Sequence, residues 1–202
     1  CEPVFVPLNP PTFSFDPNVL EDAFRGGAKA IIICNPSNPS GKVFTEEELK
    51  TIADLCIRYD VYAIMDEVYE HIIYDGRKHV YMNSIPGMWE RTVSCSSLSK
   101  TYSVTGWRLG YACGPKVILK QILKIHQFAI MCAPTTSQYA AIEALRHGDD
   151  DVEKMRDEYD RRRRFLLNAF DEMGIECFEP YGAFYMFPSI KKFGMSSDEF
   201  AT

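Results

Sequence analysis

Short hydrophobic runs alternate along this chain with segments in which hydrophobic positions recur every three or four residues. The runs Ala28–Cys34 and Val61–Met65 are almost continuously apolar, which is typical of strands buried on both faces of a sheet. Between them, Leu49, Ile52 and Cys56 recur at helical spacing. A strand, a helix and a second strand within about 40 residues form a βαβ unit, so the pattern predicts a sheet that is at least partly parallel.

Capping residues, glycines and further periodic segments define the other elements. Thr45 and Glu48 have the spacing of a capping box and predict the start of the helix between the two strands. Gly26 and Gly27 predict the end of a short helix over 18–24. We expect further strands over 92–96, 109–113, 175–178 and 183–187, and further helices over 116–132, 137–147 and 151–173. The apolar content of 117–131 predicts that the first of these helices lies in a core.

The long helix predicted over 151–173 is the natural boundary between a first domain over 1–150 and a second part over 151–202. Its run Arg161–Arg164 could suggest a contact with nucleic acid. However, Asp157, Glu158 and Asp160 each precede an arginine of the run by four residues, which predicts ion pairs on a solvated helix face. The helix also carries an apolar stripe, formed by Met155, Tyr159, Leu166, Phe170 and Met173.

Polar residues cluster where three successive predicted strands end. In open α/β sheets, ligands bind in the crevice outside the carboxyl ends of the strands. We therefore expect these side chains to converge on one edge of the sheet. They are Asn38 after the first strand, Asp66 and Tyr69 after the second, and Ser97, Ser99 and Lys100 after the third.

These residue types together suit one particular ligand. The amine of a lysine can form a Schiff base with an aldehyde, and hydroxyl and guanidinium groups can hold a phosphate. A carboxylate can pair with a protonated ring nitrogen, and neutral donors can hold a phenolate oxygen. An aldehyde, a phosphate, a pyridinium and a phenolate describe pyridoxal phosphate. The candidate groups are Lys100 for the aldehyde, Ser97, Ser99 and Arg108 for the phosphate, Asp66 for the ring nitrogen, and Asn38 and Tyr69 for the phenolate.

The same motifs resemble those of the class I and II aminotransferases of the aspartate aminotransferase fold. The matching segments are Asn35–Gly41, Asp66–Tyr69, Ser97–Lys100, Thr105–Gly110 and Glu179–Tyr185, and they occur in the family's order. The resemblance implies an α/β fold with a mainly parallel sheet and helices on both faces. Residues 1–150 would belong to the large domain that binds pyridoxal phosphate, and residues 151–202 would comprise the interdomain helix and the start of a smaller α+β domain.

The resemblance also implies a role for each candidate residue. Lys100 would carry the cofactor and act as the catalytic residue, Asp66 would pair with the pyridine nitrogen, Asn38 and Tyr69 would contact the ring hydroxyl, and Ser97, Ser99 and Arg108 would hold the phosphate. The substrates would be an amino acid and a 2-oxo acid, and the protein would be a homodimer. Ser40 stands where the family more often has threonine.

Some of the family's active-site groups would lie outside this chain. Its first phosphate-binding loop and the aromatic ring that stacks on the cofactor would precede Cys1, and its arginine for the substrate α-carboxylate would follow Thr202. We therefore expect the 202-residue chain alone to be inactive or a weak catalyst.

Four of the candidate residues also have a simpler structural interpretation. Lys100 could be a surface lysine, Asp66 a helix N-cap, Tyr69 a packing residue and Ser99 a cap or turn residue. Trp107 fits packing better than stacking on a ligand. Phe184 and Tyr185 could border a substrate cleft or belong to the core. The four histidines show no ligand spacing, and we assign them no chemistry.

Composition narrows the possible functions further. The formal net charge of −6 argues against an electrostatic contact with nucleic acid or with an anionic membrane. No stretch of hydrophobic residues is long enough to span a bilayer. The seven cysteines include no C-x-x-C pair, which makes a zinc or thioredoxin-like site unlikely; their positions in apolar runs predict buried, reduced thiols and a cytoplasmic protein.

Three functions are compatible with this sequence. Transamination agrees best with the resemblance. A β-elimination carbon–sulfur lyase or a related synthase would use the same lysine and aspartate, because the cofactor performs the difficult step. An aminotransferase-like sensor domain of a transcription regulator would require a DNA-binding domain before Cys1, and the acidic balance gives that interpretation no support.

Overall fold

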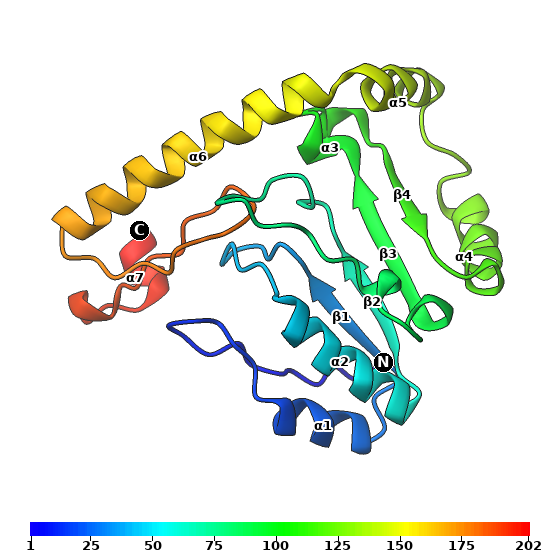
Figure 1. Ribbon diagram of the computed structural model, residues 1–202, viewed down its shortest axis with the longest axis horizontal. Helices are drawn as coiled ribbons and strands as arrows, with labels where there is room; N and C mark the ends of the chain where they lie inside the picture. Colours follow the sequence, from blue (N-terminus) through cyan, green and yellow to red (C-terminus); the bar gives the residue numbers. More distant parts are fainter.

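The computed structural model describes residues 1–202 and contains one four-stranded sheet. Its strands are β1 (Ala30–Cys34), β2 (Tyr62–Asp66), β3 (Thr92–Ser97) and β4 (Gly110–Cys113), in spatial order β1-β2-β3-β4 (Figure 1). The pairs β1–β2 and β2–β3 are parallel, whereas β3–β4 is antiparallel. The predicted α/β fold with a mainly parallel sheet is confirmed.

Two helices cover one face of this sheet, and others extend away from it. Helix α3 directly follows β3, and the long helix α6 leads from the region beside α3 and α5 to the C-terminal segment (Figure 1). The helices are α1 (Pro17–Arg25), α2 (Glu46–Tyr59), α3 (Leu98–Thr101), α4 (Lys116–Ala129), α5 (Thr135–His147), α6 (Asp149–Glu172) and α7 (Ser197–Ala201). None of them is both long and apolar enough to cross a membrane.

Helix α2 begins at the predicted capping box. The Thr45 hydroxyl accepts a hydrogen bond from the Glu48 backbone N–H at 3.1 Å, and the Glu48 carboxylate accepts one from the Thr45 N–H at 2.9 Å. Helices α1 and α2 pack on one face of β1 and β2. This packing forms the main hydrophobic core, whose most buried members include Leu20, Leu49, Ile52, Cys56, Ala63, Met65, Met82 and Met88.

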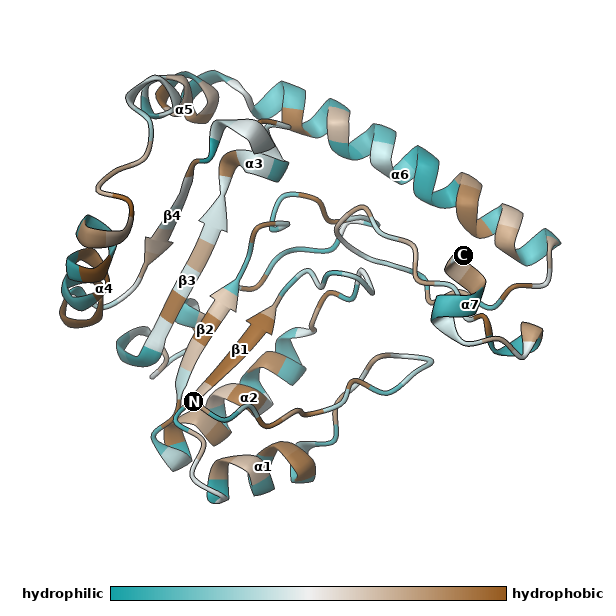
Figure 2. Ribbon diagram, turned by 180° about the vertical axis from the view of Figure 1, so that it is seen from behind, coloured by the Kyte–Doolittle hydropathy of each residue, from teal (hydrophilic) through white to brown (hydrophobic).

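The opposite face of the same strands is open in this chain. Ile32 is 75% exposed and Ile64 is 37% exposed, whereas Ala63 and Met65, which point to α1 and α2, are fully buried. In Figure 2, β1 is coloured as strongly hydrophobic. The prediction that β1 and β2 are buried on both faces is therefore wrong for these residues, because α1 and α2 cover only one of the two faces.

Helix α4 is also more exposed than its apolar sequence predicts. It contains no buried residue, and Val117, Ile125 and Phe128 are 69%, 72% and 95% exposed. The prediction of a core helix is wrong here, because most of its apolar side chains are exposed. The cysteines are also more exposed than the sequence predicts. All seven are free thiols, but only Cys56 is buried.

The C-terminal segment lacks the two strands predicted over 175–178 and 183–187. Only isolated bridges form there, between Cys177 and Pro188 and between Ile73 and Gly182. The aromatic rings of this segment pack on the N-terminal arm instead of on a sheet: Phe13 lies 5.0 Å from Phe178 and 5.8 Å from Phe187, measured between ring centroids. Tertiary packing therefore overrides the strand pattern.

Helix α6 confirms part of the predicted ion pairing and contradicts the rest. Glu158 pairs with Arg162 at 2.7 Å, and Asp160 pairs with Arg164 at 2.9 Å, as expected for residues four apart. Asp157 pairs with its neighbour Arg156 instead. Arg163 does not lie on a solvated face at all, because it is only 5% exposed.

Arg163 joins the long helix to two other segments. Its guanidinium binds Asp75 at 2.8 Å, Asp160 at 2.7 Å and the Pro180 carbonyl oxygen at 3.0 Å. The guanidinium carbon also lies 4.8 Å from the centre of the Tyr74 ring. The contact therefore connects α6, the turn after Tyr74 and the segment around Pro180.

Candidate active site

Asp66 lies at the carboxyl edge of the sheet, on the open face. It is the last residue of β2, and its in-register partners are Cys34 on β1 and Cys95 on β3. Residues opposite each other in neighbouring strands point to the same face, and so does every second residue along a strand. Ser97, two residues after Cys95, therefore shares the face of Asp66. The predicted convergence on one edge of the sheet is confirmed for these two residues.

Asp66 has no positively charged partner in this chain. Its carboxylate is exposed and accepts a long hydrogen bond of 3.4 Å from the Val68 backbone N–H. No ion pair involves it, although its main-chain carbonyl oxygen accepts a hydrogen bond from the Asn35 N–H at 2.9 Å. The carboxylate is therefore held at a strand end and remains free to pair with a cationic group. No α-helix follows it, which rules out the alternative role of a helix N-cap.

Lys100 lies on the one-turn helix α3, directly after β3. Its side chain makes no ion pair and no hydrogen bond. The residue is half-buried, and its Nζ atom lies 5.7 Å from the centre of the Phe184 ring. A surface lysine would normally be fully exposed to water. The partial burial of Lys100 therefore argues against the simpler interpretation of it as a surface lysine. The amine lies beside an aromatic wall, which is formed by Phe184, Tyr69 and Tyr185, and no carboxylate forms an ion pair with it.

Tyr69 connects the Asp66 turn to the same aromatic wall. It is 3% exposed, and its ring stands edge-to-face on Phe184 at 5.3 Å. Its hydroxyl is hydrogen-bonded to the hydroxyl of Tyr185. Burial, together with this hydrogen bond, raises the pKa of Tyr69 well above its usual value, so the phenol stays protonated at neutral pH. Tyr69, three residues after Asp66, and Lys100 therefore both lie next to the Phe184 ring.

The hydroxyls of Ser97 and Ser99 lie at the start of α3. Ser97 Oγ accepts a hydrogen bond from the Ser99 N–H at 3.1 Å and donates to the Leu109 carbonyl oxygen at 2.9 Å. The two hydroxyl oxygens are 2.8 Å apart. Ser97, not Ser99, is therefore the helix cap. Ser99 is buried beside it, and the two hydroxyls are hydrogen-bonded to each other.

Arg108 is tied to this pair through Thr105. Its backbone is in the left-handed region, with φ at 53°, and its Nη1 donates to the Thr105 carbonyl oxygen at 2.9 Å. The Thr105 hydroxyl donates to the Ser99 carbonyl oxygen at 3.1 Å. The guanidinium is exposed and has donors to spare. Ser97, Ser99 and Arg108 therefore form a connected set of donors at one end of α3.

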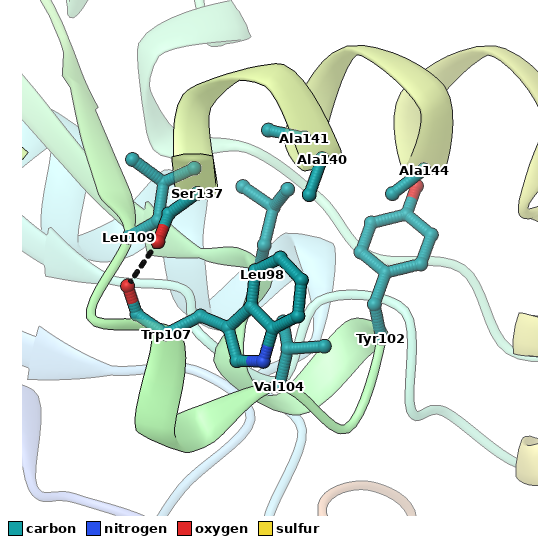
Figure 3. Close-up of a pocket in the computed structure, with 9 residues that line it drawn as sticks. All are labelled: Leu98, Tyr102, Val104, Trp107, Leu109, Ser137, Ala140, Ala141 and Ala144. Carbon is teal, nitrogen blue, oxygen red and sulfur yellow. Dashed lines mark hydrogen bonds between the residues drawn. The ribbon is translucent and has the colours of Figure 1, made fainter. Parts of the chain in front are cut away.

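Trp107 supports this set by packing, as the sequence predicts. Its ring lines a small apolar pocket between α3 and α5, together with residues such as Leu98 and Ala144 (Figure 3). The buried Ser137 hydroxyl donates to the Trp107 carbonyl oxygen at 2.8 Å. The pocket contains hardly any polar surface to hold a ligand, and we assign it the role of fixing the backbone before Arg108.

Asn38 lies on the loop after β1 and is exposed. The loop is held at its base, where the Asn35 side-chain oxygen accepts a hydrogen bond from the Phe44 N–H at 3.0 Å. Gly41 is required in it, because a Cβ atom there would lie 2.3 Å from Pro180. The Asn38 side chain makes no hydrogen bond, so the loop presents a free amide near the Asp66 edge.

Two buried carboxylates follow Asp66 on the same turn, and the sequence did not predict their hydrogen-bond partners. Glu67 is paired with His79 at 2.9 Å, and both side chains are almost fully buried. Glu70 accepts hydrogen bonds from the hydroxyls of Ser96 and Tyr111. His79 was assigned no chemistry, because nothing in the sequence connects it to Glu67. Of the three carboxylates on this turn, only that of Asp66 is exposed at the candidate site.

The chain is similar to known aminotransferases along its whole length. The family model described as aminotransferase class I and II matches residues 1–201. The chain is 45% identical to an aspartate aminotransferase of Pyrococcus abyssi, over 86% of this chain and 45% of that protein. It is 40% identical to aromatic-amino-acid aminotransferase 2 of Thermococcus litoralis, over 94% of this chain and 49% of that protein.

The solved structures agree with the sequence comparison. The model superimposes on the crystal structure of an aromatic aminotransferase from Pyrococcus horikoshii with a TM-score of 0.89 and 40% identity, over 94% of this chain and 51% of that one. The chain thus spans about half the length of the curated relatives that it matches. Its full-length match to the family model, and the solved structures that share its fold, establish that this chain belongs to the class I and II aminotransferases, a family that uses pyridoxal phosphate.

Proposed function

We propose that the full-length protein transfers an amino group between an amino acid and a 2-oxo acid, with pyridoxal phosphate bound covalently to Lys100. One observation carries the proposal. The Lys100 amine and the Asp66 carboxylate share one edge of the sheet, and neither has an ionic partner in this chain. A single ligand that carries both an aldehyde and a protonated ring nitrogen would satisfy both groups.

The available donors suit each part of the cofactor. A phosphate requires several hydrogen-bond donors and a positive charge, which Ser99, Ser97 and Arg108 supply together. A protonated ring nitrogen requires an anion, which Asp66 supplies. The ring hydroxyl requires neutral donors, which Tyr69 and the free Asn38 amide supply. No group in this set has to break an ion pair in order to bind.

In the proposed reaction, the bound cofactor serves as an electron sink for the bond that breaks at the substrate α-carbon. The Lys100 amine, once displaced by the substrate, would take the proton from this α-carbon and deliver it to the cofactor. Asp66 keeps the ring nitrogen protonated, because a carboxylate stabilises the neighbouring cation. The Phe184 ring lies beside the lysine amine.

The relatives favour transamination over elimination, because they are named as aminotransferases of aspartate and of aromatic amino acids. Their variety leaves the amino acid unspecified. Consumption of the amino acid should require a 2-oxo acid in stoichiometric amounts. Release of ammonia and pyruvate from a β-substituted amino acid, without any 2-oxo acid, would instead indicate a lyase.

Borohydride trapping tests the role of Lys100. The full-length protein with bound cofactor should absorb visible light, and borohydride reduction followed by peptide mapping should place the label on Lys100. Lys100→Ala should remove both the band and the label. Lys124→Ala is the matched control, because this lysine lies on the surface of α4 and should leave both unchanged. A label on another lysine in the unmodified protein would refute the proposal.

We further propose that the full-length protein is a homodimer and that α6 joins its large and small domains. The exposed apolar side chains of α4 support an additional contact, since an unpartnered face of this kind is costly in water. Light scattering of the full-length protein should give twice the mass of one chain. A monomer at micromolar concentration would contradict the dimer.

A further inference from the structure

We propose that Tyr185 is a positioning residue that acts through Tyr69 on the ring hydroxyl oxygen of the cofactor. This inference rests on the proposed function, because it adds Tyr185 to the residues that would bind the cofactor. Tyr185 is not among the residues assigned to the phosphate or to the ring nitrogen, and its sequence position is compatible with either a cleft or a core role.

The contact between the two tyrosines is specific and lies inside the aromatic wall. Their hydroxyl groups are hydrogen-bonded to each other, and no other side chain bonds to the Tyr69 hydroxyl. Their rings meet edge-to-face, with centroids 5.6 Å apart and an interplanar angle of 82°. Phe184, which lies below the Lys100 amine, packs against both rings. The pair therefore borders the proposed position of the cofactor.

The segment that carries Tyr185 is anchored independently of this hydrogen bond. The Ala183 N–H donates to the Ile72 carbonyl oxygen at 2.9 Å, and the Tyr74 hydroxyl donates to the Ala183 carbonyl oxygen. A Cβ atom on Gly182 would lie 2.7 Å from Pro36, so the segment also packs closely on the loop before Asn38. Loss of the Tyr185 hydroxyl should therefore leave its ring in place.

The direction of the hydrogen bond follows from the number of available hydrogens. A phenol has one O–H donor, and its oxygen can also accept. If Tyr69 donates its only hydrogen to the ring oxygen of the cofactor, the bond between the tyrosines must be donated by Tyr185. Burial keeps Tyr69 protonated, which makes it a donor at neutral pH. A chain of two hydroxyls polarises the last donor and strengthens its bond to an anionic oxygen.

The predicted consequence is a change in the acidity of the bound cofactor. Without the Tyr185 hydroxyl, Tyr69 is a weaker donor, and the ring oxygen retains more negative charge. The proton on the nitrogen that joins the cofactor to Lys100 is then held more tightly. We expect Tyr185→Phe to raise the pKa of this nitrogen by less than about 0.4 to 1 pH unit, the shift that loss of one whole ordinary hydrogen bond produces, because the bond from Tyr69 is weakened and not removed.

The test is a pH titration of the visible absorption band of the full-length, cofactor-loaded protein, with the cofactor dissociation constant measured alongside. Tyr159→Phe is the matched control. Tyr159 packs on the same Phe184 ring at 5.3 Å, but its hydroxyl makes no hydrogen bond, so its loss should not shift the titration. Thermal unfolding of the cofactor-free variants should show that both retain the fold.

A double-mutant cycle separates positioning from general packing. If Tyr185 acts through Tyr69, Tyr185→Phe should shift the titration in the unmodified protein and have no further effect when Tyr69→Phe is already present. Equal shifts for Tyr185→Phe and Tyr159→Phe, or an undiminished shift in the Tyr69→Phe background, would refute this inference alone. Absence of a band linked to Lys100 in the unmodified protein would refute the proposed function as well.

Discussion

Arg163→Ala should destabilise the protein far more than its neighbour Arg162→Ala, although both arginines belong to one run on α6. The Arg163 side chain is 4% exposed and binds Asp75, Asp160 and Glu179. The Arg162 side chain is 63% exposed and binds only Glu158. Both substitutions truncate an arginine on the same helix. A difference in unfolding free energy between the two variants therefore reports the effect of burial and of the contacts that the buried Arg163 makes.

The magnitude follows from what the substitution leaves behind. Breaking a fully buried ion pair costs about 3–5 kcal/mol, because the remaining charge has no partner. Here Asp160 and Asp75 are 23% and 32% exposed, so water can partly solvate their carboxylates once the guanidinium is gone. The Pro180 carbonyl oxygen also loses a donor. We therefore expect Arg163→Ala to cost about 2–4 kcal/mol, and Arg162→Ala to cost about 0.5 kcal/mol or less.

Equilibrium unfolding in urea measures both values. The midpoint for Arg163→Ala should fall with an unchanged slope, since the surface exposed on unfolding stays the same. Hydrogen exchange should show earlier opening around Tyr181, whose N–H is bonded to the Gly41 carbonyl oxygen, because Arg163 holds this segment to α6. The reasoning would be refuted by an Arg163→Ala protein as stable as Arg162→Ala.

Three further predictions concern other parts of the chain. Burial raises the pKa of the Cys56 thiol to about 12, so a thiol reagent at pH 8 should label the exposed Cys132 rapidly and spare Cys56 until the protein unfolds, as mass spectrometry would show. Hydrogen bonds from two arginines lower the pKa of the Glu158 carboxyl from 4.5 to about 2. Its stabilising effect is therefore complete above pH 4.5 and lost as the pH falls toward 2, and Glu158→Gln should flatten the stability profile across that window; an unchanged profile would count against these bonds. Thr45→Ala should cost about 1 kcal/mol of unfolding free energy by removing the α2 cap, whereas Thr51→Ala, in the middle of the same helix, should have a smaller effect.

Local sequence signals were sufficient for the elements that are stabilised locally. The βαβ unit followed from apolar runs and helical periodicity, and the start of α2 followed from Thr45 and Glu48, because both partners of a capping box lie within one turn. The placement of Asp66 and Ser97 at one edge followed from the rule that parallel strands end at the same side of a sheet. Each of these interactions is between residues that are near each other in the chain or is dictated by strand direction.

Long-range contacts determine the other features of the fold and of the candidate site, and no local sequence pattern predicts these contacts. Tyr69 and Tyr185 are separated by 116 positions, and Arg163 and Asp75 by 88, so their meeting depends on how the C-terminal segment folds back over the sheet. The same packing replaced two predicted strands with isolated bridges, since the rings of Phe178 and Phe187 found a partner in Phe13.

The sequence by itself therefore determined the family, the parallel α/β framework and the candidate residues, because motifs and periodicity are properties of neighbouring positions. Only the tertiary structure decided which of those residues lack a counter-ion, which arginine of the run is buried and which tyrosine supports Tyr69. The physical reason is that burial and charge pairing depend on the side chains that surround a group in space, and most of these come from distant parts of the chain.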